Sequence, residues 1–379
     1  MNKLTAILSA CIIAYFLLFG CTPRAQNDSD LIHIDVRRSY PIKDLRLEEI
    51  AHIELLQLEM HDDFLFRRNP SIITDTKIIF GESNGDILIF SRDGSPISRF
   101  NRRGQGPGDY LRISILLFDE TTEELFVGHS RNIQVYSLTG EFIRSIILEQ
   151  AVFNAIDTHI TIFDEETFLL HTYSNDYPTF FSLISRKDGS LIQSINLPTD
   201  EYIITYAETS GGGIVGAPAH RIVSYKDGFL LTDFALDTVF FLSQNRELSP
   251  ILVRTPAIQS MNTVIYLNGF IEAGNYQFFS AVTVQSERGR LPQRHLMRDK
   301  TTGSAYVQRV TFDDFEGREI ILSPERIVNT QNNRLGFVSL DLTELQDALD
   351  EGRLSGRLKE IVEKSEEDGN DVFMLLHFK

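Results

Sequence analysis

Cysteine is nearly absent from this sequence. The 379 residues contain two, Cys11 and Cys21, and both lie in the apolar segment at the start of the chain. A body without thiols has no disulfide framework, no cysteine metal site and no cysteine nucleophile. With 42% hydrophobic residues, the chain is long enough for a large core to stabilise it without disulfides.

Tryptophan is missing altogether, and positive charge is scarce. The sequence has no Trp but 27 Phe, and its 36 Lys and Arg face 53 Asp and Glu, for a net charge of −17. Phe fills β-sheet cores without needing a buried hydrogen-bond partner. An acidic surface repels phosphate backbones, so we expect no nucleic-acid partner.

The sequence also lacks the common catalytic and metal-binding motifs. It contains no His-Glu-x-x-His, no Gly-x-Ser-x-Gly and no paired His at metal-ligand spacing. We therefore expect neither a metal site nor a cofactor. Six scattered histidines could still meet on one face of a folded ring: His52, His61, His129, His159, His171 and His220.

The N-terminal segment is typical of a bacterial lipoprotein. Lys3 precedes an uncharged apolar run that is short for a membrane span, as in a secretory signal peptide. Residues 18–21 (Leu-Phe-Gly-Cys) resemble the box in which cleavage before Cys frees it for lipidation. We predict a signal peptide over residues 1–20 and lipidation at Cys21, with residues 21–44 as a flexible tether. An ordinary signal peptide or an uncleaved anchor is the alternative.

The body of the chain has the pattern of an all-β protein. From about residue 50, apolar runs alternate with period two and are separated by Gly, Asn and Asp turns. Residues 87–94 (ILIFSRDG) align with residues 133–140 (IQVYSLTG) at an offset of 46. A repeat of about 40–50 residues with four strands is typical of propeller blades. We predict a six-bladed β-propeller of four-stranded antiparallel blades over residues 45–379, with five or seven blades as alternatives.

Two segments near the C-terminus stand out. Residues 342–366 have helical spacing, interrupted by Gly352 and Gly356, which predicts two short helices inserted between strands of the last blade. We expect them to cap a sheet edge, with a partner-binding helix as the alternative. Residues 372–378 are strand-like, and we expect them to pair with residues 53–58 and close the ring.

The most distinctive motif is a glycine-rich run at residues 101–110 (NRRGQGPGDY). It does not suit phosphate binding, because Pro107 removes a backbone N–H and a strand rather than a helix follows. A tight connection between blades is one interpretation. A ligand-contacting role for Arg102, Arg103 and Tyr110 is the other.

These features resemble a known family, the six-bladed propeller lipoproteins of Bacteroides-type bacteria. Those chains carry a Gly-x-Gly-Gln-Gly-Pro-Gly-Glu-Tyr-like run after the first full hairpin, and here residues 103–110 match it with Asp109 in place of Glu. Residues 237–240 (DTVF) resemble the family's Asp-Thr-Ile-Tyr strand start. The resemblance implies the fold and an envelope location, and it implies no reaction.

The sequence therefore favours a binding or scaffolding module over an enzyme. We expect an outer-membrane lipoprotein, periplasmic or surface-exposed, that is attached to the membrane by its lipid and presents a propeller face to a glycan, peptide or protein partner. The alternative is an envelope hydrolase or lyase with its site at the central channel. No oligomeric state is predicted.

Overall fold

The computed structural model describes residues 31–59, 61–66, 69–129, 131–149, 158–172, 181–197, 206–208, 211–216, 221–287, 289–324, 335–366 and 369–379. The chain divides into two units, residues 1–32 and residues 33–379, and the fold described below is that of the second. The predicted lipidation site, Cys21, lies outside the described residues. Among the described residues, no helix combines the length and apolar character needed to cross a membrane.

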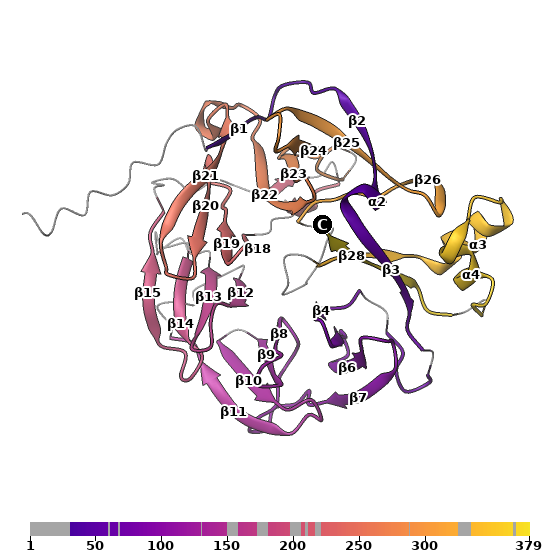
Figure 1. Cartoon of the computed structure of the whole chain (residues 1–379). Coiled ribbons are helices and arrows are strands. Elements are labelled where there is room, and N and C mark those ends of the chain that lie inside the picture. Colours follow the sequence, from indigo (N-terminus) through magenta and orange to yellow (C-terminus); the bar gives the residue numbers. More distant parts are fainter. Residues whose placement is uncertain are drawn as a thin grey trace, which may run out of the picture. The chain divides into compact units, whose positions relative to one another are not determined.

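The second unit is an all-β propeller of small antiparallel sheets, which follow one another around a common centre in chain order (Figure 1). Three blades are built from consecutive hairpins alone. Their strands, from the inside outward, are β4 (Ile72–Ile73), β5 (Lys77–Gly81), β6 (Asp86–Ser91) and β7 (Pro96–Asn101); β8 (Ile115–Asp119), β9 (Glu124–His129), β10 (Asn132–Tyr136) and β11 (Phe142–Ile147); and β12 (Thr158–Ile162), β13 (Thr167–Thr172), β14 (Phe181–Ser185) and β15 (Leu191–Ile195).

Two further blades gain a strand from the start of the chain. β1 (Ile32–Asp35) lies next to the outer strand of one, and β2 (Ile42–Arg46) pairs in parallel with the outer strand of the other. The remaining strands of these blades are β18 (Ile222–Tyr225), β19 (Gly228–Leu231), β20 (Thr238–Ser243) and β21 (Leu248–Thr255); and β22 (Ile265–Ala273), β23 (Tyr276–Thr283), β24 (Gln293–Asp299), β25 (Ala305–Phe312) and β26 (Phe315–Glu319). A separate hairpin contains β16 (Tyr206–Glu208) and β17 (Ile214–Gly216), and η3 (Ile258–Ser260) follows β21.

The two ends of the second unit meet in a three-stranded sheet. Its strands are β27 (Leu335–Leu340), β28 (Val372–Phe378) and β3 (Ala51–Gln57), and Leu376 of β28 pairs with Ile53 of β3. The predicted closure of the ring is therefore confirmed. The prediction of six four-stranded blades is wrong, because the described residues form five blades of four or more strands, and the closing sheet has three.

The start of the folded region also differs from the prediction. β1 and the first part of β2 lie within residues 21–44, which were expected to be a tether. Both strands are short, and β2 pairs with a strand more than 250 residues away in the sequence. Since this pairing is long-range, the local pattern of residues 31–46 carries little sign of it.

The two helices predicted near the C-terminus are present, and a further short helix before β3 was not predicted. α3 (Leu342–Asp350) and α4 (Gly356–Val362) lie between β27 and β28, and α2 (Leu47–Ile50) precedes β3. Asp341 caps α3 by accepting a hydrogen bond from the backbone N–H of Glu344. Leu345 and Leu358 are fully buried in a cluster that also contains Met374 of β28. The helices therefore cap the closing sheet and its outer strand, β3, as predicted.

Phenylalanine fills the spaces between blades. Phe126 of β9 and Phe168 of β13 meet edge to face, with ring centroids 5.2 Å apart. Phe80 of β5 also contacts Phe373 of the closing sheet, in a tilted arrangement with ring centroids 6.2 Å apart. Aromatic rings contribute large apolar contact areas, which explains how a chain without Trp or disulfides is held together.

A repeated glycine contact links each hairpin blade to the preceding sheet. Gly94, Gly140 and Gly189 occupy the turn before the outer strand and have φ values of 95°, 80° and 78°. A Cβ at Gly140 would overlap the ring of Phe100 on β7, and one at Gly189 would overlap the carbonyl oxygen of Ile147 on β11. These turns need glycine for two reasons, the left-handed backbone and the close approach of the preceding outer strand. The alignment of residues 87–94 with residues 133–140 thus reflects equivalent positions in two blades.

Candidate functional site

The glycine-rich run at residues 101–110 connects β7 to β8. The ring of Tyr110 is buried, with 2% of the residue exposed. Its hydroxyl donates to the carbonyl oxygen of Gly85 at 2.6 Å and accepts from the backbone N–H of Arg102 at 3.0 Å. Burial raises the pKa of Tyr110, so the phenol stays protonated and continues to donate. Tyr110 therefore anchors the loop to the β4–β7 blade.

The two arginines of this loop differ in their surroundings. Arg102 donates from Nε to the carbonyl oxygen of Gly140 at 3.0 Å, which ties the loop to the hairpin of the next blade. Arg103 is exposed, and only its backbone N–H is fixed, by the side chain of Asn101. The contacts support the interpretation of this run as a tight connection between blades. A ligand-contacting role for Arg102, Arg103 and Tyr110 stays a prediction; both arginines are exposed, whereas Tyr110 is buried.

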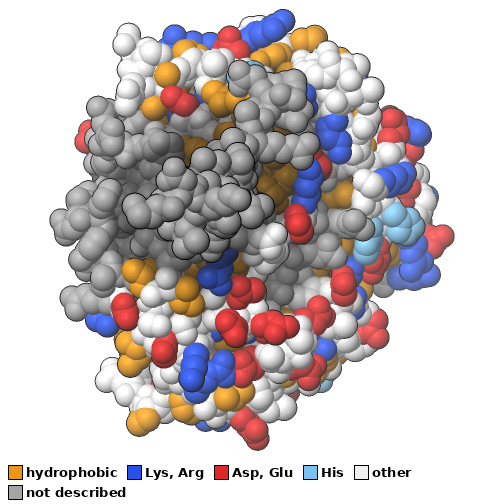
Figure 2. Space-filling view, turned by 60° about the vertical axis from the view of Figure 1, so that its left-hand side comes forward, with side chains coloured by type: hydrophobic (Ala, Val, Ile, Leu, Met, Phe, Trp, Pro, Cys, Tyr) orange, Lys and Arg blue, Asp and Glu red, His pale blue; other side chains and the backbone are white. Residues whose placement is uncertain are grey.

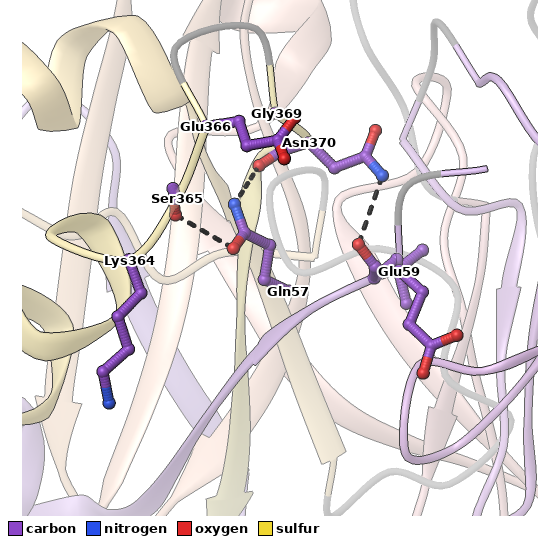
Figure 3. A pocket seen from close by; sticks show the side chains of 8 residues that line it. Gln57, Glu59, Lys364, Ser365, Glu366, Gly369 and Asn370 are labelled. Atoms are coloured by element: carbon purple, nitrogen blue, oxygen red, sulfur yellow. Dashed lines mark hydrogen bonds between the residues drawn. The ribbon is translucent and has the colours of Figure 1, made fainter. Parts of the chain in front are cut away.

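A pocket of about 470 Å³ opens beside the closing sheet, between the end of β3 and the segment that leads from α4 to β28. Figure 3 shows its polar walls. Gln57 donates to the carbonyl oxygen of Asn370 at 2.7 Å and accepts from the hydroxyl of Ser365 at 2.9 Å. Asn370 in turn donates to the carbonyl oxygen of Leu58 at 3.2 Å. The lining residues are Gln57, Leu58, Glu59, Lys364, Ser365, Glu366, Gly369 and Asn370.

These contacts limit what the pocket can do. The amides of Gln57 and Asn370 bond to neighbouring parts of the wall, so they fix its shape more than they face a ligand. The charged side chains are those of Glu59, Lys364 and Glu366, and they include no histidine, cysteine or other nucleophile-base pair. Within the described ranges, no group of three His, Cys, Asp or Glu side chains is placed to hold a metal ion. The pocket is thus an open hollow lined mainly by polar and charged residues.

A buried charged cluster joins the β12–β15 blade to the β18–β21 blade. His171 at the end of β13 lies 3.1 Å from Asp233, measured from Nε2 to Oδ2, and Arg221 lies 2.8 Å from the same oxygen. Because a carboxylate only accepts, Nε2 of His171 must carry the proton of this hydrogen bond. Arg221 also stacks over the ring of Phe234, 3.8 Å from its centroid. The cluster therefore bonds two neighbouring blades to each other.

Burial controls the protonation of this cluster. It lowers the pKa of His171 to about 4, so the imidazole is neutral near pH 7. Burial by itself would raise the pKa of Asp233, but the hydrogen bond from His171 and the charge of Arg221 outweigh it and lower that pKa. The result is one compensated ion pair, Asp233 with Arg221, and one neutral histidine. Since His171 is fully buried, this arrangement stabilises the fold and is not open to a substrate.

Sequence reasoning identified only part of this cluster. His171 was one of six scattered histidines, and of the described members of that set His159 and His171 are in ring contact, at 6.1 Å. Asp233 and Arg221 were not predicted. His171 and Asp233 are 62 residues apart, and no motif spacing links them.

The described residues define an all-β propeller. The chain belongs to a family described as a domain of unknown function, DUF4934, whose sequence model matches residues 31–377. No curated protein matches the chain in sequence.

The fold is shared with a solved structure, and two others are more distantly similar. A Bacteroides fragilis NCTC 9343 protein described as exported is 13% identical, with a TM-score of 0.63, and the match covers 92% of this chain and 99% of that one. A DUF4221 family member from Bacteroides vulgatus ATCC 8482 is 9% identical over 87% of this chain and 97% of that one, with a TM-score of 0.47. BamB from Moraxella catarrhalis is 11% identical over 86% of this chain and 98% of that one, with a TM-score of 0.39. The propeller fold implied by the family resemblance is confirmed, and the lipid anchor stays a prediction.

Proposed function

We propose that this protein is a lipid-anchored module of the cell envelope that binds or scaffolds a peptide or protein partner. The anchor is inferred from the segment that ends at Cys21, and the envelope location is consistent with the likeness to a Bacteroides protein described as exported. The finer location, the outer membrane, rests on the lipoprotein-like sequence. The propeller supplies a rigid platform, on which the partner is held by surface contacts.

One observation carries the binding role, an uneven distribution of exposed apolar side chains. Most of the large exposed hydrophobic residues lie on the outer strands of consecutive blades, on β7, β11, β15 and the start of β21. Exposed apolar side chains that recur on the outer strands of neighbouring blades are candidates for an interaction surface. They are Ile97, Phe142, Ile143, Ile147, Leu191, Ile192 and Leu248.

The charge on the surface agrees with this choice of partner. Figure 2 shows acidic and basic side chains interspersed with hydrophobic ones on the face that it presents. Such a mixed surface does not suit the phosphate backbone of a nucleic acid. Of the partner classes expected from the sequence, a glycan has the least support, because the amides of Gln57 and Asn370 already donate to backbone carbonyl oxygens of the pocket wall.

The proposal is tested in cells that produce the protein, in two experiments. For the anchor, Cys21→Ser should move the protein from the membrane fraction to the soluble fraction, and a substituted protein that still sediments with membranes would refute lipidation. For binding, a photo-crosslinking residue is placed at Ile143 or Ile192, with exposed Glu351 on α3's C-terminal side as the control position. We expect a crosslinked partner from the two apolar positions and none from Glu351. Equal results at all three positions would contradict the binding role.

A further inference from the structure

We infer that β15 is a docking strand, to which an extended, uncharged peptide of another protein adds as a further strand of the β12–β15 blade. This inference rests on the proposed binding function and specifies its site. β15 is the last strand of its sheet in the described chain, and β14 is its paired neighbour. Leu191, Ile192, Gln193 and Ser194 are all exposed, whereas Ile195 is buried. The strand therefore offers an apolar, uncharged edge to solvent.

The outer strands of the other two hairpin blades carry protective features. β7 begins with Pro96 and carries Arg99, whose guanidinium bonds to Asp86 at 2.9 Å. β11 carries Arg144, which bonds to Glu124 at 2.8 Å. Proline and charged side chains are the usual means by which proteins prevent pairing at an open edge.

The last two blades have their outer edges occupied. β21 has β1 beside it, and β25 pairs with β2 over five residues, from Ile42 with Val307 to Arg46 with Thr311. Among the outer strands of the five described blades, β15 alone has no proline, no charge and no added strand. An edge of this kind has unpaired N–H and C=O groups that a peptide can bond.

The chain itself indicates the kind of occupant. β1 and β2 are short extended segments that lie on outer strands of neighbouring blades, so the rim of this propeller accepts an additional strand. The net charge is −17, yet all five residues of β15 are neutral, so an uncharged segment fits this strand best. Apolar side chains at alternate positions would pack on Leu191 and Ile192.

A second copy of the chain fits less well. A five-residue strand is about 17 Å long. Pairing two such edges buries much less than the roughly 1,200 Å² of a stable interface. Two copies that each carry a net charge of −17 would also repel.

The test uses the detergent-solubilised full chain and a defined probe, a fluorescein-labelled decapeptide of alternating Thr and Val, followed by fluorescence anisotropy. We expect saturable binding that Ile192→Lys weakens at least tenfold. The matched control is Ile42→Lys, at a similarly exposed position on β2 outside the proposed binding surface, which should leave binding within twofold. A second probe of the same sequence with alternate amides N-methylated should not bind, because strand addition needs those N–H groups.

Four outcomes would overturn the inference: no saturable binding of the decapeptide, equal binding by wild type and Ile192→Lys, equal binding of the N-methylated probe, or a wild-type dimer that Ile192→Lys converts to a monomer. Both variants replace exposed residues, so circular dichroism should show unchanged folding. If the decapeptide fails while the crosslinks at Ile143 and Ile192 persist, the docking strand is wrong and the binding role stands. If the decapeptide does not bind and no crosslinks form at Ile143 and Ile192, the binding role is wrong as well.

Discussion

The two halves of this propeller differ in what lies along the outer edges of their blades. In the half formed by β18–β28 with β1–β3, added strands lie on β21 and β25, and helices α3 and α4 pack on the closing sheet. In the half formed by β4–β15, each blade is a run of consecutive hairpins, and the outer strands carry exposed apolar side chains. Among the described residues, the closed half has other segments of the chain on its outer edges, and the open half has none there.

The open half depends on its glycine turns, and disturbing one should have the largest effect. In Gly189→Ala, the new Cβ would overlap the carbonyl oxygen of Ile147 in addition to requiring a φ of 78°. We expect a loss of about 4 kcal/mol in the free energy of unfolding, since backbone strain and overpacking add. Urea denaturation measures it.

The matched control for this change is Gly317→Ala, in the closed half. Gly317 has a φ of 77°, but nothing lies within 4 Å of a Cβ built there. The free energy of unfolding of Gly317→Ala should fall by only about 1 kcal/mol, which is the cost of placing alanine in the left-handed backbone conformation. Equal losses in the two variants would show that the glycine contact does not join the blades.

The closed half should depend on the added strand β2. Leu45 is 4% exposed and belongs to the cluster that contains Met297 and Val310. Leu45→Ala should therefore cost about 3 kcal/mol, the usual range for a buried leucine. Thermal unfolding followed by circular dichroism would detect it, and a change below about 0.5 kcal/mol would mean that β2 is only loosely attached.

The boundary between the halves should respond to pH. The pKa of His171 is lowered from 6.5 to about 4 in the folded chain, so the unfolded chain takes up this proton first as pH falls. The contribution of neutral His171 to the free energy of unfolding is complete above pH 6.5. As the pH falls from 6.5 to 4, the free energy of unfolding should decrease by roughly 2 to 3 kcal/mol. The pKa of Asp233 is also lowered on folding, from its ordinary value of 3.8. Asp233 therefore reduces the free energy of unfolding only when the pH falls below 3.8, where the unfolded chain takes up this proton first.

This pH dependence has its own control. His171→Gln keeps a hydrogen-bond donor but has no proton to gain, so its unfolding free energy should change less between pH 6.5 and 4 than that of the wild type. Parallel curves for the two proteins would show that His171 does not cause the acid sensitivity.

The smallest effect is expected at the rim of the open half. Ile192 is 45% exposed on β15, so Ile192→Ser should change the unfolding free energy by less than about 0.5 kcal/mol. The same substitution should still weaken peptide binding. A large loss of stability would mean that Ile192 contributes to packing, and the open edge would lose its interpretation as a binding surface.

Local patterns predicted the parts of this fold that are local. Alternating residues and turn glycines identified the hairpins, as at Ile87 and Gly94, and helical spacing identified α3 and α4. The pairing of β3 with β28 was predictable because a propeller must close. The glycine-rich run was predicted as a connection between blades, and Tyr110 and Arg102 make that connection.

The parts that were missed are long-range. The four residues of β1 and five of β2 are too few to show a period, and their partners lie more than 200 residues away. The blade count depended on dividing the chain by an average blade length, which cannot reveal that the closing sheet has three described strands. Asp233 and Arg221 meet His171 only through the packing of two blades.

Hydrogen exchange in the full chain tests the difference between the two rims most directly. In β25, which pairs with β24 from Ala305 to Val307 and with β2 from Val307 to Thr311, the amides that bond to these strands should be slow to exchange. In β15, the amides of Leu191–Ile195 that do not face β14 should exchange within seconds, and they should become slow when the Thr-Val decapeptide is added. Equal protection of β15 and β25 without any peptide would contradict an open edge on the β12–β15 blade.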